Sequence, residues 1–336
     1  MITTRPVLLA LRALGLGDLL AAVPALRGLR SAFPEHRRLL ATPSWLHPLC
    51  ELIGGWEPVP MPDLAAKPPP LAGHLDVAVN LHGNGPRSAS VLDSLLPRHR
   101  IGHRRPGWPG PDWIRQLPER HRWCRLLTAH GIVADELDLR LHHPRRPAAA
   151  EGAILVHPGS ARAAKRWPLS RFAEVAAAYS AAGHRVVITG SAAERELADR
   201  VADLAGPGPE VLAGRTDLRR LAAQVFASRL VISGDTGIAH LAYAYRTPTV
   251  TLFGPVEPWL SGPPPVGPHR TLGGTHPRGD LLADQPDPSL LEITVDDVLA
   301  SGSELGVPPS AVPDDEYAEP APASALVGSE PVARSS

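Results

Sequence analysis

Short apolar segments alternate with longer segments of helical periodicity, and this alternation constrains the fold more than any other feature. In the second half of the chain the apolar segments lie at 153–156, 185–189, 230–232 and 249–253. The amphipathic segments that lie between them are at 170–182, 192–204, 218–227 and 237–245. Strands that are apolar on both faces are typical of a parallel sheet covered by helices on both sides. This half therefore predicts a Rossmann-like α/β domain.

The first half repeats this pattern less regularly. Strands are predicted at 7–11 and 75–81, and helices at 19–33, 88–96 and 113–130, with interruptions expected at Pro24 and Pro118. The segment 141–152 is polar, bounded by prolines and without apolar period, as expected of a linker. At about 150 residues per domain, a chain of 336 residues fits two domains.

Together these features predict two Rossmann-like parallel-sheet domains that face each other across a central cleft. The first domain is predicted at 1–145 and the second at 152–302. A proline-rich tail at 303–336 has no apolar period and is expected to be disordered.

The charge balance and the two cysteines exclude several classes of protein. The chain has 34 basic and 34 acidic side chains, so no global field attracts nucleic acid or an anionic membrane. Cys50 and Cys124 are far apart and form no metal-binding or disulfide pattern. No run of about 18 apolar residues is present, and the apolar stretch near the start is a poor secretion signal because Arg12 and Asp18 interrupt it. A cytoplasmic protein is expected.

The turn after the first strand reads Gly15-Leu16-Gly17-Asp18 and invites comparison with dinucleotide-binding turns. The third glycine of that fingerprint should fall at Leu20, so the pattern fails. Asp18 would also compete with a pyrophosphate for the amides at the start of the helix. An NAD-dependent oxidoreductase is therefore disfavoured.

Two interpretations of Asp18 remain open from the sequence. Aspartate is a good N-cap residue, so Asp18 is explained by a structural role at the start of a helix. Alternatively, it is a carboxylate at the carboxyl edge of a parallel sheet, where ligands bind in such folds. A carboxylate there can act as a general base toward an attacking hydroxyl.

Three loops in the second half of the chain contain residues suited to binding phosphate and ribose. The loop 157–168 is small and then densely basic; its candidate donor-binding residues are Ser160, Arg162 and Lys165. Lys165 is one of two lysines in the chain, and it is interpreted either as a solvated surface residue or as a cation that neutralises a phosphate leaving group.

The loop at 233–240 precedes a predicted helix. The free amides of Thr236 and Gly237 would open that helix and form an anion site, with His240 one turn further on. The alternative is a helix capped by Asp235 with a packed histidine. The third loop contains Gly190 and Glu194, and its carboxylate either binds ribose hydroxyls or starts a helix.

At these residues the chain resembles glycosyltransferase family 9, the ADP-heptose heptosyltransferases, which have the GT-B fold. The resemblance runs over roughly 5–262. It rests on the ordered motifs Gly17-Asp18-Leu-Leu-Ala-Ala-Val-Pro24, Arg162-Ala-Ala-Lys165-Arg-Trp167-Pro168, Gly234-Asp235-Thr236-Gly237-Ile-Ala-His240 and Phe253-Gly254-Pro255. Ala21-Ala22 depart from the His-Thr pair that members acting on the lipopolysaccharide core often have.

The resemblance implies a role for each matched residue. Asp18 corresponds to the general base and Lys165 to a lysine that contacts the donor phosphates, so both are predicted to be catalytic. Asp235, Thr236, Gly237 and His240 are predicted to line the diphosphate and sugar pocket, and Glu194 to lie beside the ribose. On the acceptor side, the candidates are Gly17, Asn80, His82 and Arg87.

These roles predict an inverting, metal-independent transfer of a sugar, such as the heptose of ADP-heptose, to a hydroxyl of a glycan, glycolipid or small molecule. No DxD-like pair lies on a predicted cleft loop, and no cofactor is expected. A membrane-bound acceptor would be met at the membrane surface, without nucleic acid as a partner. The alternatives are a non-catalytic nucleotide-sugar-binding protein, a related epimerase or hydrolase, and an NAD-dependent oxidoreductase.

Overall fold

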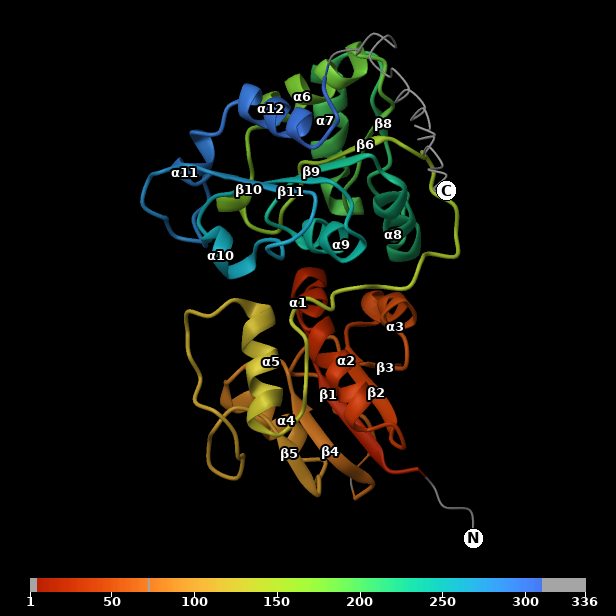
Figure 1. Cartoon of the computed structure of the whole chain (residues 1–336), viewed down its shortest axis with the longest axis vertical. Helices are drawn as coiled ribbons and strands as arrows, with labels where there is room; N and C mark the ends of the chain where they lie inside the picture. Colours follow the sequence, from red (N-terminus) through yellow and green to blue (C-terminus); the bar gives the residue numbers. More distant parts are fainter. Residues whose placement is uncertain (1–4, 72, 310–336) are drawn as a thin grey trace, which may run out of the picture.

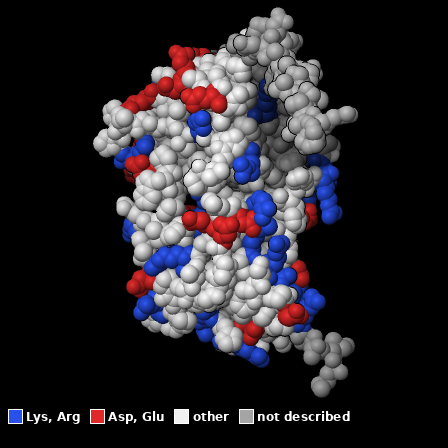
Figure 2. Space-filling view, in the orientation of Figure 1, with Lys and Arg blue, Asp and Glu red and all other residues white. Residues whose placement is uncertain are grey.

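Two parallel β-sheets form the core of two α/β domains. The computed structural model describes residues 5–71 and 73–309 (Figure 1). In Figure 1 the domain coloured red to yellow lies below the domain coloured green to blue, and a yellow-green segment connects them. Figure 2 shows basic and acidic side chains interspersed over this face of the molecule, in keeping with the balanced charge.

The first sheet has the strand order β3-β2-β1-β4-β5, and its neighbouring strands are parallel. The strands are β1 (Val7–Leu11), β2 (Arg37–Thr42), β3 (Glu57–Pro60), β4 (Leu75–Asn80) and β5 (His99–Ile101). The helices are α1 (Leu16–Ala21), α2 (Val23–Ala32), α3 (His47–Ile53), α4 (Pro86–Asp93) and α5 (Glu119–Ala129). The order reverses between β1 and β4, which is where such sheets bind ligands.

The second sheet has the order β11-β10-β9-β6-β7-β8 and is also parallel. Its strands are β6 (Ile154–His157), β7 (Val186–Ile188), β8 (Glu210–Val211), β9 (Leu230–Gly234), β10 (Thr249–Phe253) and β11 (His269–Gly273). Its helices are α6 (Leu169–Ala181), α7 (Arg195–Ala205), α8 (Leu218–Ala227), α9 (Gly237–Tyr245), α10 (Pro258–Ser261), α11 (Pro288–Leu291) and α12 (Val295–Glu304). The predicted architecture of two parallel-sheet domains is confirmed.

The helix predicted at 19–33 is two helices in the structure. The first ends at Ala21, Ala22 caps it, and the second begins at Val23. Pro24 lies in the first turn of the second helix, where a missing backbone N–H leaves no hydrogen bond unmade. The helix predicted at 113–130 begins only at Glu119, with Pro118 as its N-cap residue, and the segment 113–118 before it is not helical.

The two domains contact each other through α1 and α9, which run close together. Both positions of closest approach are glycines. A Cβ on Gly17 would lie 2.9 Å from Cδ2 of His240, and a Cβ on Gly237 would lie 2.7 Å from Cβ of Leu16. These glycines therefore allow the first turn of each helix to approach the other domain at the carboxyl edges of the two sheets.

The second domain extends further than predicted. Helix α12 continues to Glu304, and Val307 is buried, with its carbonyl accepting a hydrogen bond of 3.1 Å from the Tyr179 hydroxyl. The boundary expected at 302 therefore falls too early, because this segment packs on α6. The rest of the predicted tail, 310–336, lies outside the described residues. No helix within 5–71 and 73–309 has the length and apolar character needed to cross a membrane.

A buried histidine in the first domain predicts a loss of stability in acid. His103 is 3% exposed, lies against Trp113 and Trp123, and has no hydrogen-bond partner among the described residues for either ring nitrogen. Burial, assisted by the charge of Arg122, lowers the pKa of His103 to about 4. In the unfolded chain a histidine has a pKa of about 6.5, so between these values the unfolded state binds more protons.

The free energy of unfolding is therefore expected to fall as the pH decreases from about 6.5 to about 4, by roughly 2–3 kcal/mol from this residue. Urea unfolding at pH 7.5 and at pH 5 measures the difference. His103→Phe should reduce it, whereas the same measurement on His74→Gln, at an exposed position, should match the parent protein. An unchanged pH dependence in His103→Phe would assign the acid sensitivity to another group.

Candidate functional site

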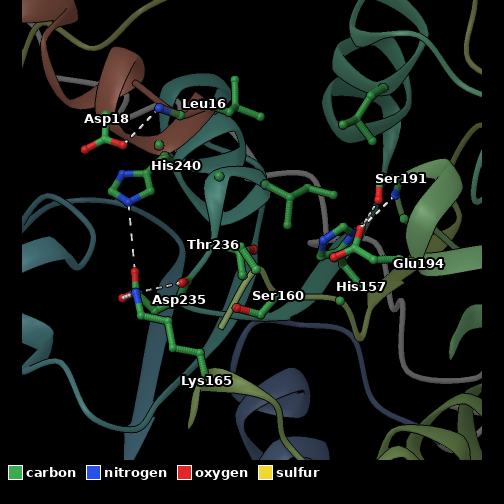
Figure 3. A pocket seen from close by; sticks show the side chains of 18 of the residues that line it. Leu16, Asp18, His157, Ser160, Lys165, Ser191, Glu194, Asp235, Thr236 and His240 are labelled. Carbon is green, nitrogen blue, oxygen red and sulfur yellow. Dashed lines mark hydrogen bonds and ion pairs between the residues drawn. The ribbon is translucent and has the colours of Figure 1, made fainter. Parts of the chain in front are cut away.

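A cavity of about 660 Å³ lies between the two domains. It is lined by the first turn of α1 from one domain and by the loops that follow β6, β7 and β9 from the other. In Figure 3, Asp18, His240, Asp235 and Lys165 follow one another along one side, while Ser191 and Glu194 lie at the other end. Both sheets thus direct the carboxyl ends of their strands toward one shared space.

Asp18 is the third residue of α1, and Gly15 occupies the N-cap position. The interpretation of Asp18 as the N-cap residue itself is therefore wrong, although its carboxylate still serves the helix start. Oδ2 accepts a hydrogen bond of 3.1 Å from the Gly15 amide, and the side chain is 46% exposed where it lines the cavity. Asp18 therefore has one oxygen held by the backbone and a carboxylate that faces the cavity.

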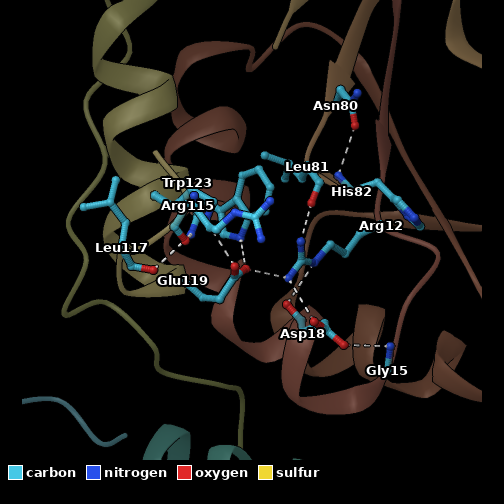
Figure 4. Close-up of polar contacts among 11 residues, drawn as sticks. Arg12, Gly15, Asp18, Asn80, Leu81, His82, Arg115, Leu117, Glu119 and Trp123 are labelled. Carbon is cyan, nitrogen blue, oxygen red and sulfur yellow. Dashed lines mark hydrogen bonds and ion pairs between the residues drawn. The ribbon is translucent and has the colours of Figure 1, made fainter. Parts of the chain in front are cut away.

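Arg12, at the end of β1, is a buried cation behind Asp18 that the sequence analysis did not identify as part of the site (Figure 4). Its side chain is 1% exposed. Nε donates to the Asp18 carbonyl at 3.0 Å, Nη2 lies 3.5 Å from Asp18 Oδ1, and Nη1 donates to the carbonyl of Leu81. A charged residue at the end of an otherwise apolar strand was the signal available in the sequence.

Glu119 is a second carboxylate that the sequence analysis did not identify. It is the first residue of α5, it lines the cavity, and its Oε2 accepts 3.1 Å from Nη2 of Arg12. Oε2 also accepts 2.9 Å from the indole N–H of Trp123, and Oε1 accepts 3.1 Å from Nε of Arg122. Two carboxylates therefore share one buried guanidinium at the first-domain wall of the cavity.

Lys165 and Asp235 form an ion pair on the opposite wall. Nζ of Lys165 lies 2.6 Å from Asp235 Oδ2 and 3.3 Å from the Asp235 carbonyl oxygen. The aspartate side chain is 6% exposed and the lysine side chain 19%. Lys165 is thus not a solvated surface residue, and it reaches the cavity with its charge partly balanced.

Helix α9 begins at this wall without a side-chain cap. Thr236 is its N-cap residue, so the alternative of a cap at Asp235 is wrong, and no side chain in the described part of the chain caps the helix start. Thr236 Oγ1 is buried and has no hydrogen-bond partner among the described residues. Exposed amides at the start of a nine-residue helix form a site for negative charge.

His240 lies between Asp18 and the ion pair of Asp235 with Lys165 (Figure 3). Its Nε2 lies 4.0 Å from Asp235 Oδ1, and its ring is close enough to Gly17 to restrict that position to glycine. Burial lowers the pKa of His240, against the opposing effect of Asp235. The imidazole is therefore neutral at neutral pH. It lines the cavity between the Asp18 side and the Lys165 side.

Glu194 is held at the far end of the cavity. Its Oε2 accepts from the amide and from the hydroxyl of Ser191, both at 2.8 Å. Burial raises the pKa of Glu194, but the Ser191 hydrogen bonds and the nearby His157 and Arg166 lower it overall. Burial also lowers the pKa of His157. The helix-start interpretation of Glu194 is thus correct, and the carboxylate still lines the cavity.

The remaining candidates divide into two groups. Ser160, Arg162 and Gly190 line the cavity beside Lys165 and Glu194, as does Gly17 from the first domain. Three acceptor-side candidates are not among its lining residues: Asn80, His82 and Arg87. Asn80 is buried, and its amide donates 3.0 Å to the Ser88 hydroxyl while its Oδ1 accepts 3.1 Å from the His82 amide. Its contacts shape the loop after β4.

The cavity also contains residues that no motif indicated. Trp45, 56% exposed, lines it from the first domain, and Leu218 and Leu221 line it from α8. These side chains give one end of the cavity an apolar wall. Within the described residues, no three His, Cys, Asp or Glu side chains come together as a group suited to a metal ion.

Comparisons with known sequences support the resemblance drawn from the motifs. Residues 131–275 match the profile of glycosyltransferase family 9 (heptosyltransferase). Lipopolysaccharide heptosyltransferase 2 from Salmonella typhimurium is 32% identical over 199 residues, which cover 55% of this chain and 54% of that protein. The matched part of this chain therefore spans about half the length of that curated relative.

Solved structures extend the likeness to both domains. A family 9 glycosyl transferase from Veillonella parvula has a TM-score of 0.73 at 20% identity, and the alignment covers 91% of this chain and 98% of that chain. The E. coli ADP-heptose lipopolysaccharide heptosyltransferase II has a TM-score of 0.69 at 23% identity, covering 89% and 98%. The expected GT-B architecture of two parallel-sheet domains is thereby confirmed.

One structural neighbour is described as containing iron. An iron-containing dodecameric glycosyltransferase from enterotoxigenic E. coli has a TM-score of 0.60 at 18% identity, and the alignment covers 90% of this chain and 76% of that chain. At this identity the likeness concerns the fold alone.

Proposed function

We propose that this protein is an inverting glycosyltransferase that moves a sugar from a nucleotide diphosphate donor to a hydroxyl of a glycan, glycolipid or small-molecule acceptor. The donor is proposed to be ADP-heptose, as the names of the matched relatives suggest. One observation carries this conclusion. The Asp18 carboxylate on one domain faces, across one cavity, the Lys165 ammonium and the uncapped start of α9 on the other.

In the proposed reaction the acceptor hydroxyl gives its proton to Asp18. Its oxygen forms a bond to the anomeric carbon while the bond from that carbon to the diphosphate oxygen breaks, and the nucleoside diphosphate leaves with the electron pair. Attack opposite the leaving group inverts the anomeric configuration. Holding both reactants in one cavity supplies much of the rate enhancement, because the reacting atoms need not find each other in solution.

The second domain stabilises the charge that develops on the leaving group. Thr236 and Gly237 line the cavity at the start of α9, which has no side-chain cap, and the Thr236 hydroxyl has no hydrogen-bond partner among the described residues. Lys165 adds a cation whose position Asp235 fixes. Fixed donors of this kind are strongest where water is excluded. We therefore propose that the transfer requires no divalent metal ion.

The nucleoside occupies the other end of the cavity in this proposal. Glu194 keeps one oxygen bound to Ser191 and presents the other to a ribose hydroxyl, beside Gly190. Ser160 and Arg162 lie between the ribose and the phosphates, and Leu218 and Leu221 face the base. The acceptor approaches from the first domain past Gly17, and Asn80, His82 and Arg87 act from the loop after β4 rather than from the cavity wall.

We also place the reaction in the cytoplasm, where nucleotide-sugar donors are made, with a membrane-bound acceptor met at the membrane surface.

Nucleotide binding is the first test of this function. Thermal unfolding is measured with ADP, UDP, GDP and ADP-heptose at equal concentrations. ADP at about 100 times its Kd should stabilise the protein by about 2.7 kcal/mol, and UDP and GDP should stabilise it by less. NAD, included as a control, should give no shift. Stabilisation by NAD and by no nucleoside diphosphate would favour the oxidoreductase alternative.

Transfer is tested by measuring the release of ADP from ADP-heptose with heptose-free lipopolysaccharide, a glycolipid extract and free monosaccharides as acceptors. Mass spectrometry identifies the product. Heptose joined to an acceptor supports the transferase. ADP binding without turnover under any of these conditions would favour the non-catalytic alternative, and ADP release without acceptor modification would favour a hydrolase.

A further inference from the structure

We infer that Arg12 and Glu119 form a positioning pair for Asp18: Arg12 orients its carboxylate, and Glu119 balances the charge of Arg12 when Asp18 takes up a proton. This inference deepens the proposed function and rests on the role of Asp18 as the general base. None of the motifs that indicated the site includes either residue. The two are 107 positions apart in the chain.

Arg12 holds both the backbone and the side chain of Asp18. Nε donates to the Asp18 carbonyl at 3.0 Å and Nη2 lies 3.5 Å from Oδ1, while the Gly15 amide holds Oδ2 at 3.1 Å. Because the carboxylate is contacted on both oxygens, its plane is fixed relative to the cavity. A fixed orientation matters for proton transfer, which requires a hydrogen bond of suitable geometry to the acceptor hydroxyl.

The guanidinium itself is fixed from three other directions. Nη1 donates to the Leu81 carbonyl at the end of β4, Nη2 donates to Glu119, and the group lies 4.7 Å from the centre of the Trp123 ring. Figure 4 shows Arg12 between Asp18 and Glu119, with Trp123 on the α5 side. A side chain held by β4, α1 and α5 has little freedom to follow Asp18 if that residue moves.

Glu119 is itself held in place and faces the same cavity. Trp123 and Arg122, both on α5, donate to its two oxygens at 2.9 and 3.1 Å. Its side chain is 33% exposed, less than that of Asp18. Glu119 accepts from three donors, two guanidinium groups and one indole N–H, whereas Asp18 accepts from one guanidinium nitrogen and one backbone amide and is more exposed to the cavity, so Glu119 is assigned to positioning and not to proton transfer with the acceptor.

Two guanidinium groups, those of Arg12 and Arg122, meet two carboxylates here, those of Asp18 and Glu119, so the charges balance only while both carboxylates are ionised. A buried guanidinium stays protonated, and an uncompensated buried charge is strongly unfavourable. During transfer Asp18 takes the acceptor proton and becomes neutral, so it no longer balances Arg12. Glu119 then remains 3.1 Å from the guanidinium as its counter-ion. With Glu119 absent, Arg12 would favour the ionised form of Asp18 and oppose proton uptake.

The test compares Glu119→Gln with the parent protein in three measurements: the Kd for ADP, the rate of ADP-heptose transfer and the thermal stability. The rate constant kcat should fall about tenfold, part of the usual range for general base catalysis, with the ADP Kd within about twofold of the parent value. In an Asp18→Asn background the same substitution should cause no further loss of kcat, because no base remains to be positioned.

Asp138→Asn is the matched control, since Asp138 pairs with Arg27 at 2.7 Å, is partly buried to a similar degree and does not line the cavity. Its kcat should match the parent value. Arg12→Lys, which keeps the positive charge, should retain more activity than Arg12→Met. Should the Arg12 variants fail to fold, Glu119→Gln decides alone.

The inference is overturned if Glu119→Gln behaves like Asp138→Asn, or if it lowers activity equally in the Asp18→Asn background. A loss confined to the ADP Kd would also overturn it. These outcomes differ from failure of the proposed function, which would show as no transfer by the parent protein or as full activity of Asp18→Asn.

Discussion

Asp18→Asn is expected to lower the rate of sugar transfer by about a thousandfold, within the range usual for loss of a general base. The amide has the shape of the carboxylate and can still accept the hydrogen bond from the Gly15 amide, so α1 keeps its start. An asparagine cannot take up the acceptor proton. The loss should therefore appear in kcat, while the Kd for ADP stays within about twofold of the parent value.

The separation of the two effects follows from the layout of the cavity. The groups proposed to bind the nucleotide, from Glu194 to Thr236, all come from the second domain, whereas Asp18 comes from the first. Calorimetry with ADP measures binding, and mass spectrometry of the heptosylated acceptor measures transfer. Asp138→Asn again serves as the control. Transfer at near-parental rate by Asp18→Asn would leave Asp18 with only its structural role at the start of α1.

Much of the second domain could be predicted because its strands are short, apolar and flanked by polar turns. The segments 230–232 and 249–253 correspond to β9 and β10, and the loops after β6, β7 and β9 were placed correctly at one sheet edge. In a parallel sheet the carboxyl ends of the strands meet at that edge, so strand order along the sequence is enough to bring such loops together.

Several strands escaped prediction because they lack this pattern. β2 begins with two arginines, β3 contains Pro58 and Pro60, and β5 is the three residues His99–Ile101. β3 and β5 are edge strands, where a strand has one neighbour and less apolar burial is required. β3 pairs with β2 and β5 pairs with β4, and these pairings fix their positions in the sheet. The local sequence of a strand does not reveal which strand it pairs with.

The partners of the site residues were also beyond prediction. The pairing of Arg12 with Glu119 and that of Lys165 with Asp235 join positions 107 and 70 residues apart. The motifs indicated Asp18 and Lys165 as charged residues but not their partners. In the folded chain Arg12 balances Asp18, and Asp235 balances Lys165. The sequence thus indicated several residues that line the cavity, but not which groups balance their charges.

Lys165→Ala is expected to have the second largest effect, lowering kcat/KM about a hundredfold and weakening ADP binding about tenfold. Two losses combine in this variant. The developing charge on the diphosphate loses a cation, and Asp235, 6% exposed, loses the partner at 2.6 Å that balances it. An unbalanced buried carboxylate beside the start of α9 would repel the diphosphate. Calorimetry with ADP and steady-state kinetics measure the two effects.

The double variant Lys165→Ala with Asp235→Asn separates these contributions. Removing the carboxylate together with the lysine leaves no unpaired charge, so ADP binding should recover in part, whereas kcat should stay low because the cation is still missing. Lys67→Ala changes the other lysine of the chain, which does not line the cavity, and should match the parent protein. If the double variant bound ADP no better than Lys165→Ala, the unbalanced Asp235 carboxylate would not be the cause of the weaker ADP binding. If Lys165→Ala matched Lys67→Ala, the ammonium would have no part in holding the diphosphate, and the amides of α9 would have to stabilise the leaving group alone.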